Sequence, residues 1–366
     1  MPDFDTPIPR RGTWSEKWDQ AAAEEIPLWV ADMDFAAPEP VLAALRERLG
    51  HGVLGYPHIA REVLEVVAGY QRRVHGWDVD PAWIIPLPGL VCGLHLCARA
   101  VVEPGQGILT TTPIYPPFLS APVELGRRVD RLDLSPDDGW RLHEEALAAT
   151  GDADTRSFWH NPTGRVFDAE ELAAVAAVAE TRDLVVVSDE IWADLILDDG
   201  VLHRPFAAQS AKAAARSITL TAPSKTWNLP GLGCSFAIIP DAGLRRRVRT
   251  AMGRQLPDVN ILGLVAAVAA YREGGPWLTA CRAYLRGNRD RVAAWMAERP
   301  RLRFAPGAAT YLAWFDASAY GGHLARRCHE AGVFLSDGAY FGRPGWLRVN
   351  FACPRSVLDA GLGRLA

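Results

Sequence analysis

The chain has 366 residues, which is enough for roughly two domains with a well-developed core. Apolar residues make up 49% and charged residues 22%, an ordinary balance for a globular protein. The net charge of −4, from 39 basic and 43 acidic residues, gives no reason to expect nucleic acid or an anionic membrane as a partner.

Targeting segments and cysteine usage narrow the class of protein further. The N-terminal residues carry acids and arginines without an apolar run, so we expect no signal peptide. The longest helix-like apolar run, residues 261–271, is too short to span a bilayer. The six cysteines are scattered, without a CxxC pair or a nearby histidine cluster. We therefore expect reduced thiols in a cytoplasmic protein, and neither a disulfide framework nor a metal site.

The first forty residues have the character of an extended arm, with several prolines and the apolar segment 27–35. Asp32 and Asp34 interrupt that segment, and buried acids need partners. The segment is therefore expected to line a cleft, although acids in a solvent-facing turn fit the sequence equally well. Two helices follow, over residues 38–50 and 59–74, with a glycine-rich loop at 52–57 between them.

From residue 83 onward, short apolar strands alternate with helices, which is the signature of a mostly parallel sheet covered by helices. Asp168 and Glu171 form a capping box at the start of one of these helices, which runs to about residue 182. The strands are predicted at residues 83–85, 107–112, 157–160, 184–188, 218–221 and 234–239.

After Pro240 the pattern changes to longer helices and then to short mixed elements. Helices are predicted over residues 259–271 and 276–299, and the glycine pair at 274–275 separates them. Strands at 310–315, 333–335 and 346–351 alternate with helices at 321–331 and from 354. This part is expected to form a smaller α+β domain, joined to the first by a long helix.

Four unusual side chains follow the predicted strands, at the edge where open α/β sheets bind ligands. They are Tyr115, Asn161, Asp189 and Lys225. Lys225 lies between two apolar strands, so its amine should be desolvated and neutral. An ordinary loop lysine whose amine reaches the solvent is the alternative for Lys225 taken alone.

One ligand accounts for all four side chains, namely a flat, anionic pyridine aldehyde. Lys225 would hold it as an imine, Asp189 would pair with the ring nitrogen, Asn161 would donate to the ring oxygen, and Tyr115 would stack on the ring. The segment Gly89-Leu90-Val91 opens a helix, where backbone N–H groups can bind a phosphate. Each feature alone is weak evidence for this ligand. The four together, in this order and each after a predicted strand, are strong evidence for it.

The motifs that carry a family resemblance are spread over essentially the whole chain. The chain resembles fold-type I enzymes that use pyridoxal 5'-phosphate (PLP), in the class I/II aminotransferase group. Within that group it is similar to the MalY/PatB branch of cystathionine β-lyases and cysteine C–S lyases. The segment Trp29–Phe35 is the most specific of these motifs. The others are Arg10–Ser15, Gly52–Tyr56, Ser188–Ile191, Ser224–Asn228, Tyr311–Trp314 and Leu347–Asn350.

The resemblance implies an aspartate aminotransferase-like α/β fold with a mostly parallel sheet in the large domain. Residues 1–45 would form the arm and part of the small domain, residues 46–274 the large PLP-binding domain, and residues 275–366 the small domain. It also implies a homodimer, in which Tyr56 reaches the cofactor phosphate of the neighbouring subunit. Arg348 would bind the substrate carboxylate through its planar fork. The remaining implied contacts are Ser224 and Thr221 on the cofactor, and Val30, Ala31, Asn161, Trp192 and Tyr311 on the substrate.

Two positions depart from the pattern of relatives. Trp192 stands where many aminotransferases have a tyrosine that helps to hold the ring oxygen. Gly233 stands where relatives have an arginine that binds the phosphate. We therefore expect weaker cofactor retention than in typical relatives, unless Thr221, Ser224 and Tyr56 compensate.

The leading hypothesis for the reaction is α,β-elimination from an S-substituted cysteine, which yields a thiol, pyruvate and ammonia. The tryptophans at 29, 192 and 227 and Tyr311 could line a pocket for the thiol portion, or belong to the core. Transamination uses the same residues and is the first alternative. A decarboxylating oxidative deamination of a bulky cysteine conjugate, as in the biosynthesis of an antibiotic such as a lincosamide, is another. A non-enzymatic role in binding a regulator is less favoured. The sequence leaves the thiol portion and any assembly beyond a dimer open.

Overall fold

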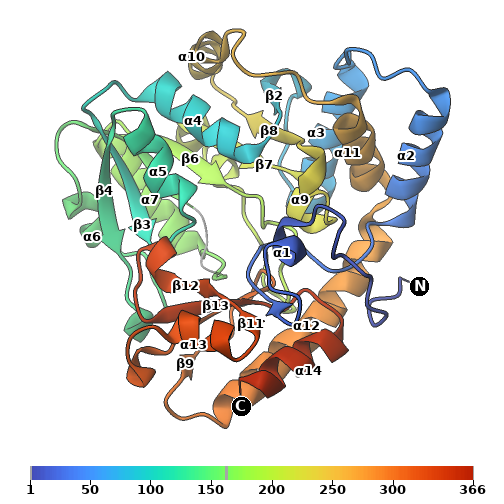
Figure 1. Cartoon of the computed structure of the whole chain (residues 1–366). Coiled ribbons are helices and arrows are strands. Elements are labelled where there is room, and N and C mark those ends of the chain that lie inside the picture. Colours follow the sequence, from blue (N-terminus) through green and yellow to red (C-terminus); the bar gives the residue numbers. More distant parts are fainter. Residues whose placement is uncertain (1, 161–163, 366) are drawn as a thin grey trace.

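The computed structural model describes residues 2–160 and 164–365, arranged as a large α/β part and a smaller α+β part (Figure 1). The large part is built on a seven-stranded sheet with the strand order β2-β8-β7-β6-β5-β3-β4. All of its strands are parallel except β8, which is antiparallel to both of its neighbours. The strands are β2 (Ile84–Leu87), β3 (Gly107–Thr112), β4 (Arg128–Asp133), β5 (Thr155–His160), β6 (Val185–Asp189), β7 (Ser217–Thr221) and β8 (Ser235–Ile238).

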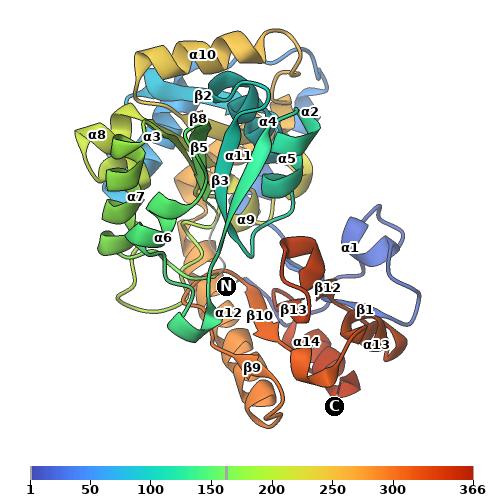
Figure 2. The same ribbon diagram turned by 90° about the vertical axis from the view of Figure 1, so that its left-hand side faces the viewer.

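Helices cover both faces of this sheet, which is why its central strands are apolar throughout. Successive residues point to opposite faces: Ile108 belongs to one apolar cluster, and Leu109 belongs to the other. Figure 2 shows α7 and α8 on one side of the sheet and α4 and α5 on the other. The covering helices are α4 (Leu90–Val101), α5 (Pro117–Glu124) and α10 (Ala242–Met252) on one face, and α6 (Glu144–Ala149), α7 (Ala169–Thr181) and α8 (Ala211–Ala215) on the other.

The smaller part contains a four-stranded antiparallel sheet with the order β12-β13-β10-β9. The N-terminal arm joins it, because β1 pairs in parallel with β11. The elements of this part and of the arm are α1 (Glu16–Asp19), β1 (Ile26–Pro27), β9 (Arg303–Phe304), β10 (Leu312–Asp316), α13 (Leu324–Glu330), β11 (Val333–Phe334), β12 (Ser336–Asp337), β13 (Trp346–Asn350) and α14 (Arg355–Arg364).

A 23-residue helix, α12 (Gly275–Ala297), leads from the large part to the small one (Figure 1). The helix before it, α11 (Ile261–Glu273), packs against α2 (Glu39–His51) and α3 (Arg61–His75). The remaining helix is α9 (Pro223–Thr226), and short 3-10 helices lie at Pro81–Trp83, Pro136–Asp138, Phe206–Ala208, Pro230–Leu232, Ser318–Tyr320 and Gly338–Phe341. None of the helices in residues 2–160 and 164–365 is long and apolar enough to cross a membrane.

The sequence-based elements differ from the structure mainly at their ends and at the sheet edge. The strand predicted at 83–85 begins one residue later, because Asp80 caps a 3-10 turn over Pro81–Trp83. The helix predicted to open at Gly89-Leu90-Val91 begins at Leu90. Strand β4 was not predicted, since its sequence, RVDRLD, is that of a half-exposed edge strand rather than an apolar one. The capping box of Asp168 and Glu171 is present as predicted.

Candidate active site

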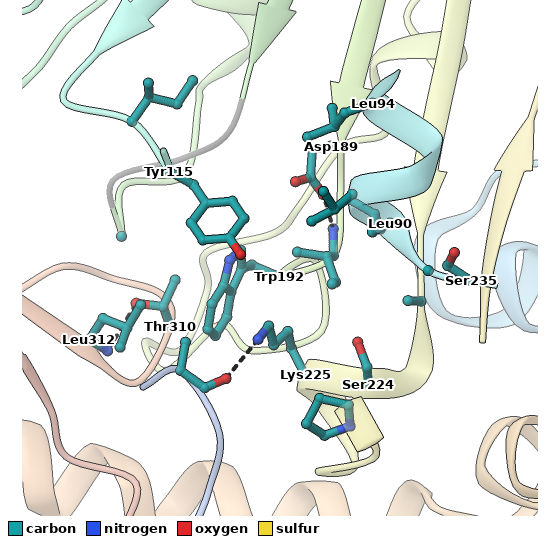
Figure 3. Close-up of a pocket in the computed structure, with 18 of the residues that line it drawn as sticks. Leu90, Leu94, Tyr115, Asp189, Trp192, Ser224, Lys225, Ser235, Thr310 and Leu312 are labelled. Atoms are coloured by element: carbon teal, nitrogen blue, oxygen red, sulfur yellow. Dashed lines mark hydrogen bonds between the residues drawn. The ribbon is translucent and has the colours of Figure 1, made fainter. Parts of the chain in front are cut away.

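A cavity of about 370 Å³ lies between the large sheet and the small one. Its walls combine the carboxyl end of β6, the start of α4, the turn at α9 and residues of the C-terminal part. The sequence-predicted residues that line it are Ala31, Gly89, Leu90, Val91, Tyr115, Asp189, Trp192, Ser224, Lys225 and Arg348. Most of them are seen in Figure 3. Asn161, also predicted for this site, lies outside the described residues.

Lys225 projects its amine into the cavity from α9 (Figure 3). The helix is a single turn that follows β7, so the backbone leaves the sheet edge directly beneath the site. Nζ donates a hydrogen bond to the carbonyl oxygen of Ala31 at 2.7 Å and lies 5.7 Å from the centre of the Trp192 ring. Burial, with a smaller contribution from the charge of Arg348, lowers the pKa of Lys225 to about 8. About a tenth of the amine is therefore unprotonated at pH 7, far more than for an ordinary lysine.

Asp189 is the last residue of β6 and its side chain is 4% exposed. The backbone N–H of Ile191 donates to its Oδ1 at 3.1 Å, which fixes the carboxylate at the strand end. Figure 3 shows Asp189 and Lys225 on different elements that line the same cavity. A buried carboxylate in this place can stabilise a protonated ring nitrogen.

Two aromatic side chains lie between these charged groups. Tyr115 is 44% exposed at the cavity rim, and desolvation raises its pKa. Trp192 is buried, and its ring meets Tyr311 edge to face at 4.8 Å. Both rings line the same cavity, and their flat surfaces can pack against a planar ring.

The start of α4 provides an anion site at one end of the cavity. Gly89 caps the helix without a side-chain hydrogen bond, so the first backbone N–H groups are available to an anion. Ser224 and Ser235 also line this cavity. Ser235 was not predicted, because nothing in the apolar segment that contains it distinguishes it from a core serine.

Gly233, the position at which the resemblance leads us to expect a phosphate-binding arginine, has a left-handed backbone with φ of +52°. A Cβ atom at this position would lie 2.8 Å from the carbonyl oxygen of Pro88. The close approach of the two backbones therefore requires glycine. In the absence of an arginine at this position, Ser224, Ser235 and the first amides of α4 are the groups that could bind a phosphate.

Arg348 reaches the cavity from β13 and is held in place without an acidic partner among the described residues. Its Nη2 donates to the carbonyl oxygen of Trp29 at 2.8 Å and to Ser336 Oγ at 3.3 Å. Its guanidinium carbon lies 4.4 Å from the centre of the Phe341 ring. Its Nε is buried and makes no hydrogen bond to the described residues. Burial lowers the pKa of Arg348 to about 10, so a carboxylate ligand would relieve an uncompensated cation.

A wider cavity of about 850 Å³ adjoins the first and shares Ala31, Tyr115, Lys225 and Arg348 with it. We call it the vestibule. The segment Trp29–Asp34 forms part of its wall, as expected for the two acids. Asp34 accepts hydrogen bonds from Lys17 at 2.7 Å and from Arg10 at 2.5 Å, and Asp32 pairs with Arg10 at 2.6 Å.

Several predicted contacts are placed elsewhere by the structure. Tyr311 is a core residue whose hydroxyl donates to the Ala31 carbonyl, and Trp227 is fully buried and donates to Gly274. Neither lines the cavity described above or the vestibule, because their rings pack in the core. Thr221 is buried at the end of β7 and does not line the inner cavity, and Val30 lines the vestibule rather than the inner cavity. Tyr56 is fully exposed in the single chain and lies outside both cavities.

Comparisons with known proteins agree with this arrangement. The family model of aminotransferase class I and II matches residues 23–365. Cystathionine β-lyase PatB of Bacillus subtilis is 36% identical over 382 residues, covering 99% of this chain and 98% of PatB. The crystal structure of OvoB superposes with a TM-score of 0.96 at 40% identity, covering 99% of this chain and 98% of that one.

A PLP-bound C–S lyase from Staphylococcus hominis has a TM-score of 0.92 at 31% identity, covering 99% of this chain and 97% of the lyase. The similarity extends over both parts of the fold. The chain therefore belongs to the aminotransferase class I and II family, in the branch of MalY, PatB and the C–S lyases.

Proposed function

We propose that this protein is a PLP-dependent C–S β-lyase that acts on S-substituted cysteines. The observation that carries the proposal is one cavity that combines a buried amine, a buried carboxylate and an arginine without an acidic partner among the described residues. Its similarity to PatB and to the C–S lyase of S. hominis favours β-elimination over the other reactions of the family.

The residues of the cavity fit the cofactor. Lys225 would hold its aldehyde carbon, Asp189 its ring nitrogen, and Trp192 and Tyr115 the faces of its ring. The first amides of α4 with Ser224 and Ser235 would hold its phosphate. When bound, PLP supplies an electron-withdrawing ring that makes the α-proton of the amino acid acidic.

The protein's own groups then have separate tasks. Arg348 binds the α-carboxylate of the substrate and so fixes the α-carbon relative to Lys225. The Lys225 amine takes the α-proton, for which its lowered pKa suits it. The bond between the β-carbon and sulfur breaks, and the thiol portion leaves through the vestibule. With one water consumed, the balance is S-substituted cysteine and water giving thiol, pyruvate and ammonia.

The test is to supply the purified protein with PLP and cystathionine or an S-alkyl cysteine. Thiol, pyruvate and ammonia are expected in equal amounts, and Lys225→Ala should abolish their release. Accumulation of the pyridoxamine form of the cofactor without pyruvate would instead identify an aminotransferase. Release of carbon dioxide with hydrogen peroxide would identify the oxidative alternative. No visible cofactor band in the protein with PLP added would refute the whole proposal.

We also propose a cytoplasmic homodimer. The end of α2 and the loop after it expose Leu49, Val53, Leu54 and Tyr56, which are 53%, 61%, 58% and 101% exposed. Apolar residues gathered on one segment suit contact with a second copy, in which Tyr56 would reach the partner's phosphate site. A cytoplasmic location is supported by the six cysteines, all of which are free and five of which are buried.

A further inference from the structure

A buried polar network lies behind the cavity, and the proposed chemistry does not use it. Its centre is Asp194, whose side chain is 9% exposed. Thr226 Oγ1 donates to Asp194 Oδ2 at 2.9 Å, and His75 Nε2 lies 3.0 Å from Asp194 Oδ1. The hydroxyl of Tyr70 also hydrogen-bonds to this carboxylate. Three side chains from α3 and α9 thus converge on one acid that follows β6.

Asp194 is ionised in this setting. Burial opposes the charge, but the hydrogen bond and charge of His75, together with the hydroxyls of Tyr70 and Thr226, lower the pKa of Asp194 below its ordinary value. A second pair, His203 Nε2 and Glu190 Oε2 at 2.9 Å, lies beside it. The two histidine rings meet edge to face at 5.4 Å, so the pairs form one continuous network.

Two residues of the network are the sequence neighbours of the two charged residues of the site. Thr226 directly follows Lys225 on the single turn of α9, and its side chain is fully buried. Glu190 directly follows Asp189, and its Oε1 accepts hydrogen bonds from Ser188 Oγ and the Phe206 N–H, both at 3.0 Å. The network therefore connects the backbone that carries the amine to the backbone that carries the carboxylate.

We propose that Asp194 is a positioning residue, which through Thr226 holds the α9 turn so that the Lys225 amine stays in register with Asp189. So short a helix as α9 is not stable by itself, and its orientation depends on tertiary contacts. The Thr226–Asp194 bond is the contact next to the lysine, in addition to the bond from Trp227 to Gly274 on the other side of Thr226. Loss of the Thr226 bond would let the turn relax and displace the amine. Displacements of this kind lower the rate of the reaction more than the affinity for the substrate.

The test compares two variants that each remove one hydroxyl from Asp194. Thr226→Val removes the bond from α9, and Tyr70→Phe removes the bond from α3. In the holoenzyme, Thr226→Val is expected to lower kcat about tenfold with KM within about twofold, and Thr226→Ser should restore kcat. Tyr70→Phe should keep kcat within about twofold of wild type, since α9 stays attached.

A second measurement uses the protein without cofactor. The pKa of Lys225 is obtained from the pH dependence of its modification by an amine-selective reagent, followed by peptide mass spectrometry. Thr226→Val should raise this pKa, because a displaced amine is less desolvated, whereas Tyr70→Phe should not. The activity test rests on the proposed function, but the labelling test does not. If wild type has no lyase activity and the labelling result holds, only the proposed function fails.

Two results would overturn the inference. One is Thr226→Val with kcat and Lys225 pKa both equal to those of wild type. The other is an equal decrease of kcat in Thr226→Val and Tyr70→Phe. That result would make Asp194 a general stabilising residue of the core rather than one that positions the lysine.

Discussion

Lys225 lies on α9 in the large part and Arg348 lies on β13 in the small sheet, yet the charge of Arg348 acts on Lys225. The charge of Arg348 is the second cause, after burial, of the lowered pKa of Lys225. The residue that would bind the substrate carboxylate therefore also helps to keep the amine neutral. A substrate carboxylate that neutralises Arg348 would partly cancel this effect and make Lys225 a stronger base at the moment of proton transfer.

Arg348→Met tests both roles of the arginine. The pKa of Lys225, measured by labelling in the cofactor-free protein, should rise above about 8, because a nearby positive charge has been removed. The KM for an S-substituted cysteine should rise about a hundredfold, since the carboxylate loses its partner. Arg326→Met, which removes an exposed arginine paired with Glu330 on α13, is the control. Unchanged KM in Arg348→Met would show that the carboxylate binds elsewhere.

Gly233 shows how a backbone contact excludes a side chain that relatives use. Gly233→Arg should lower the melting temperature and leave the affinity for PLP no tighter, because its Cβ would press against the Pro88 carbonyl. Gly231→Arg adds the same charge two residues away, where a Cβ meets nothing within 4 Å, and should fold normally. Thermal unfolding measures the melting temperature of both variants, and a PLP titration measures their affinity for the cofactor.

The expected weak retention of PLP in the unaltered protein would be refuted by an apparent Kd as low as that of a typical aminotransferase.

At the scale of elements, the segment Trp29–Asp34 connects the arm to both parts of the site. Its carbonyl groups accept hydrogen bonds from Arg348 at Trp29, from Asn350 at Val30 and from Lys225 at Ala31. The Lys17–Asp34 pair anchors the end of this segment, and both side chains are at most 3% exposed. Buried pairs of this kind hold a unique geometry when both partners are present.

Lys17→Met should therefore lower the free energy of unfolding by about 1–3 kcal/mol, because Asp34 loses one buried partner while Arg10 still compensates its charge. Chemical denaturation at neutral pH measures this value. Lys212→Met removes a lysine that is 72% exposed and pairs with Glu180, and it should change stability by less than about 1 kcal/mol. If Lys17→Met lowers the free energy of unfolding no more than this control does, Arg10 alone is sufficient to hold Asp34.

At the scale of the whole molecule, the inner cavity and the vestibule open where the arm, the large sheet and the small sheet meet. The exposed apolar loop after α2 is the part of the surface that we assign to a second copy. In such a dimer Tyr56 would complete a phosphate site that has no arginine at position 233.

Leu54→Asp should weaken the dimer at least about tenfold, since a charge would be buried against apolar surface. Sedimentation equilibrium over a range of protein concentrations measures the effect. Leu202→Asp, at a leucine that is 72% exposed elsewhere on the large part, is the control and should leave the dimer intact. A monomeric wild-type protein at micromolar concentration, with PLP bound, would contradict the assignment.

The sequence by itself determined the parallel sheet and the residues at its carboxyl edge. Four of these residues each follow an apolar strand, namely Gly89, Tyr115, Asp189 and Lys225. Parallel strands bring such positions to one edge of the sheet, independently of the loop conformations. The family motifs added Arg348, and the structure places it on the same cavity.

Only the tertiary structure decided which aromatic and polar residues reach the site and which fill the core. Tyr311 and Ser235 lie in apolar strand-like segments, where sequence alone cannot tell which face a side chain takes against its neighbours. Asp194 depends on contacts 119 residues away at His75 and 32 residues away at Thr226. Long-range packing creates such contacts, and no local pattern records them.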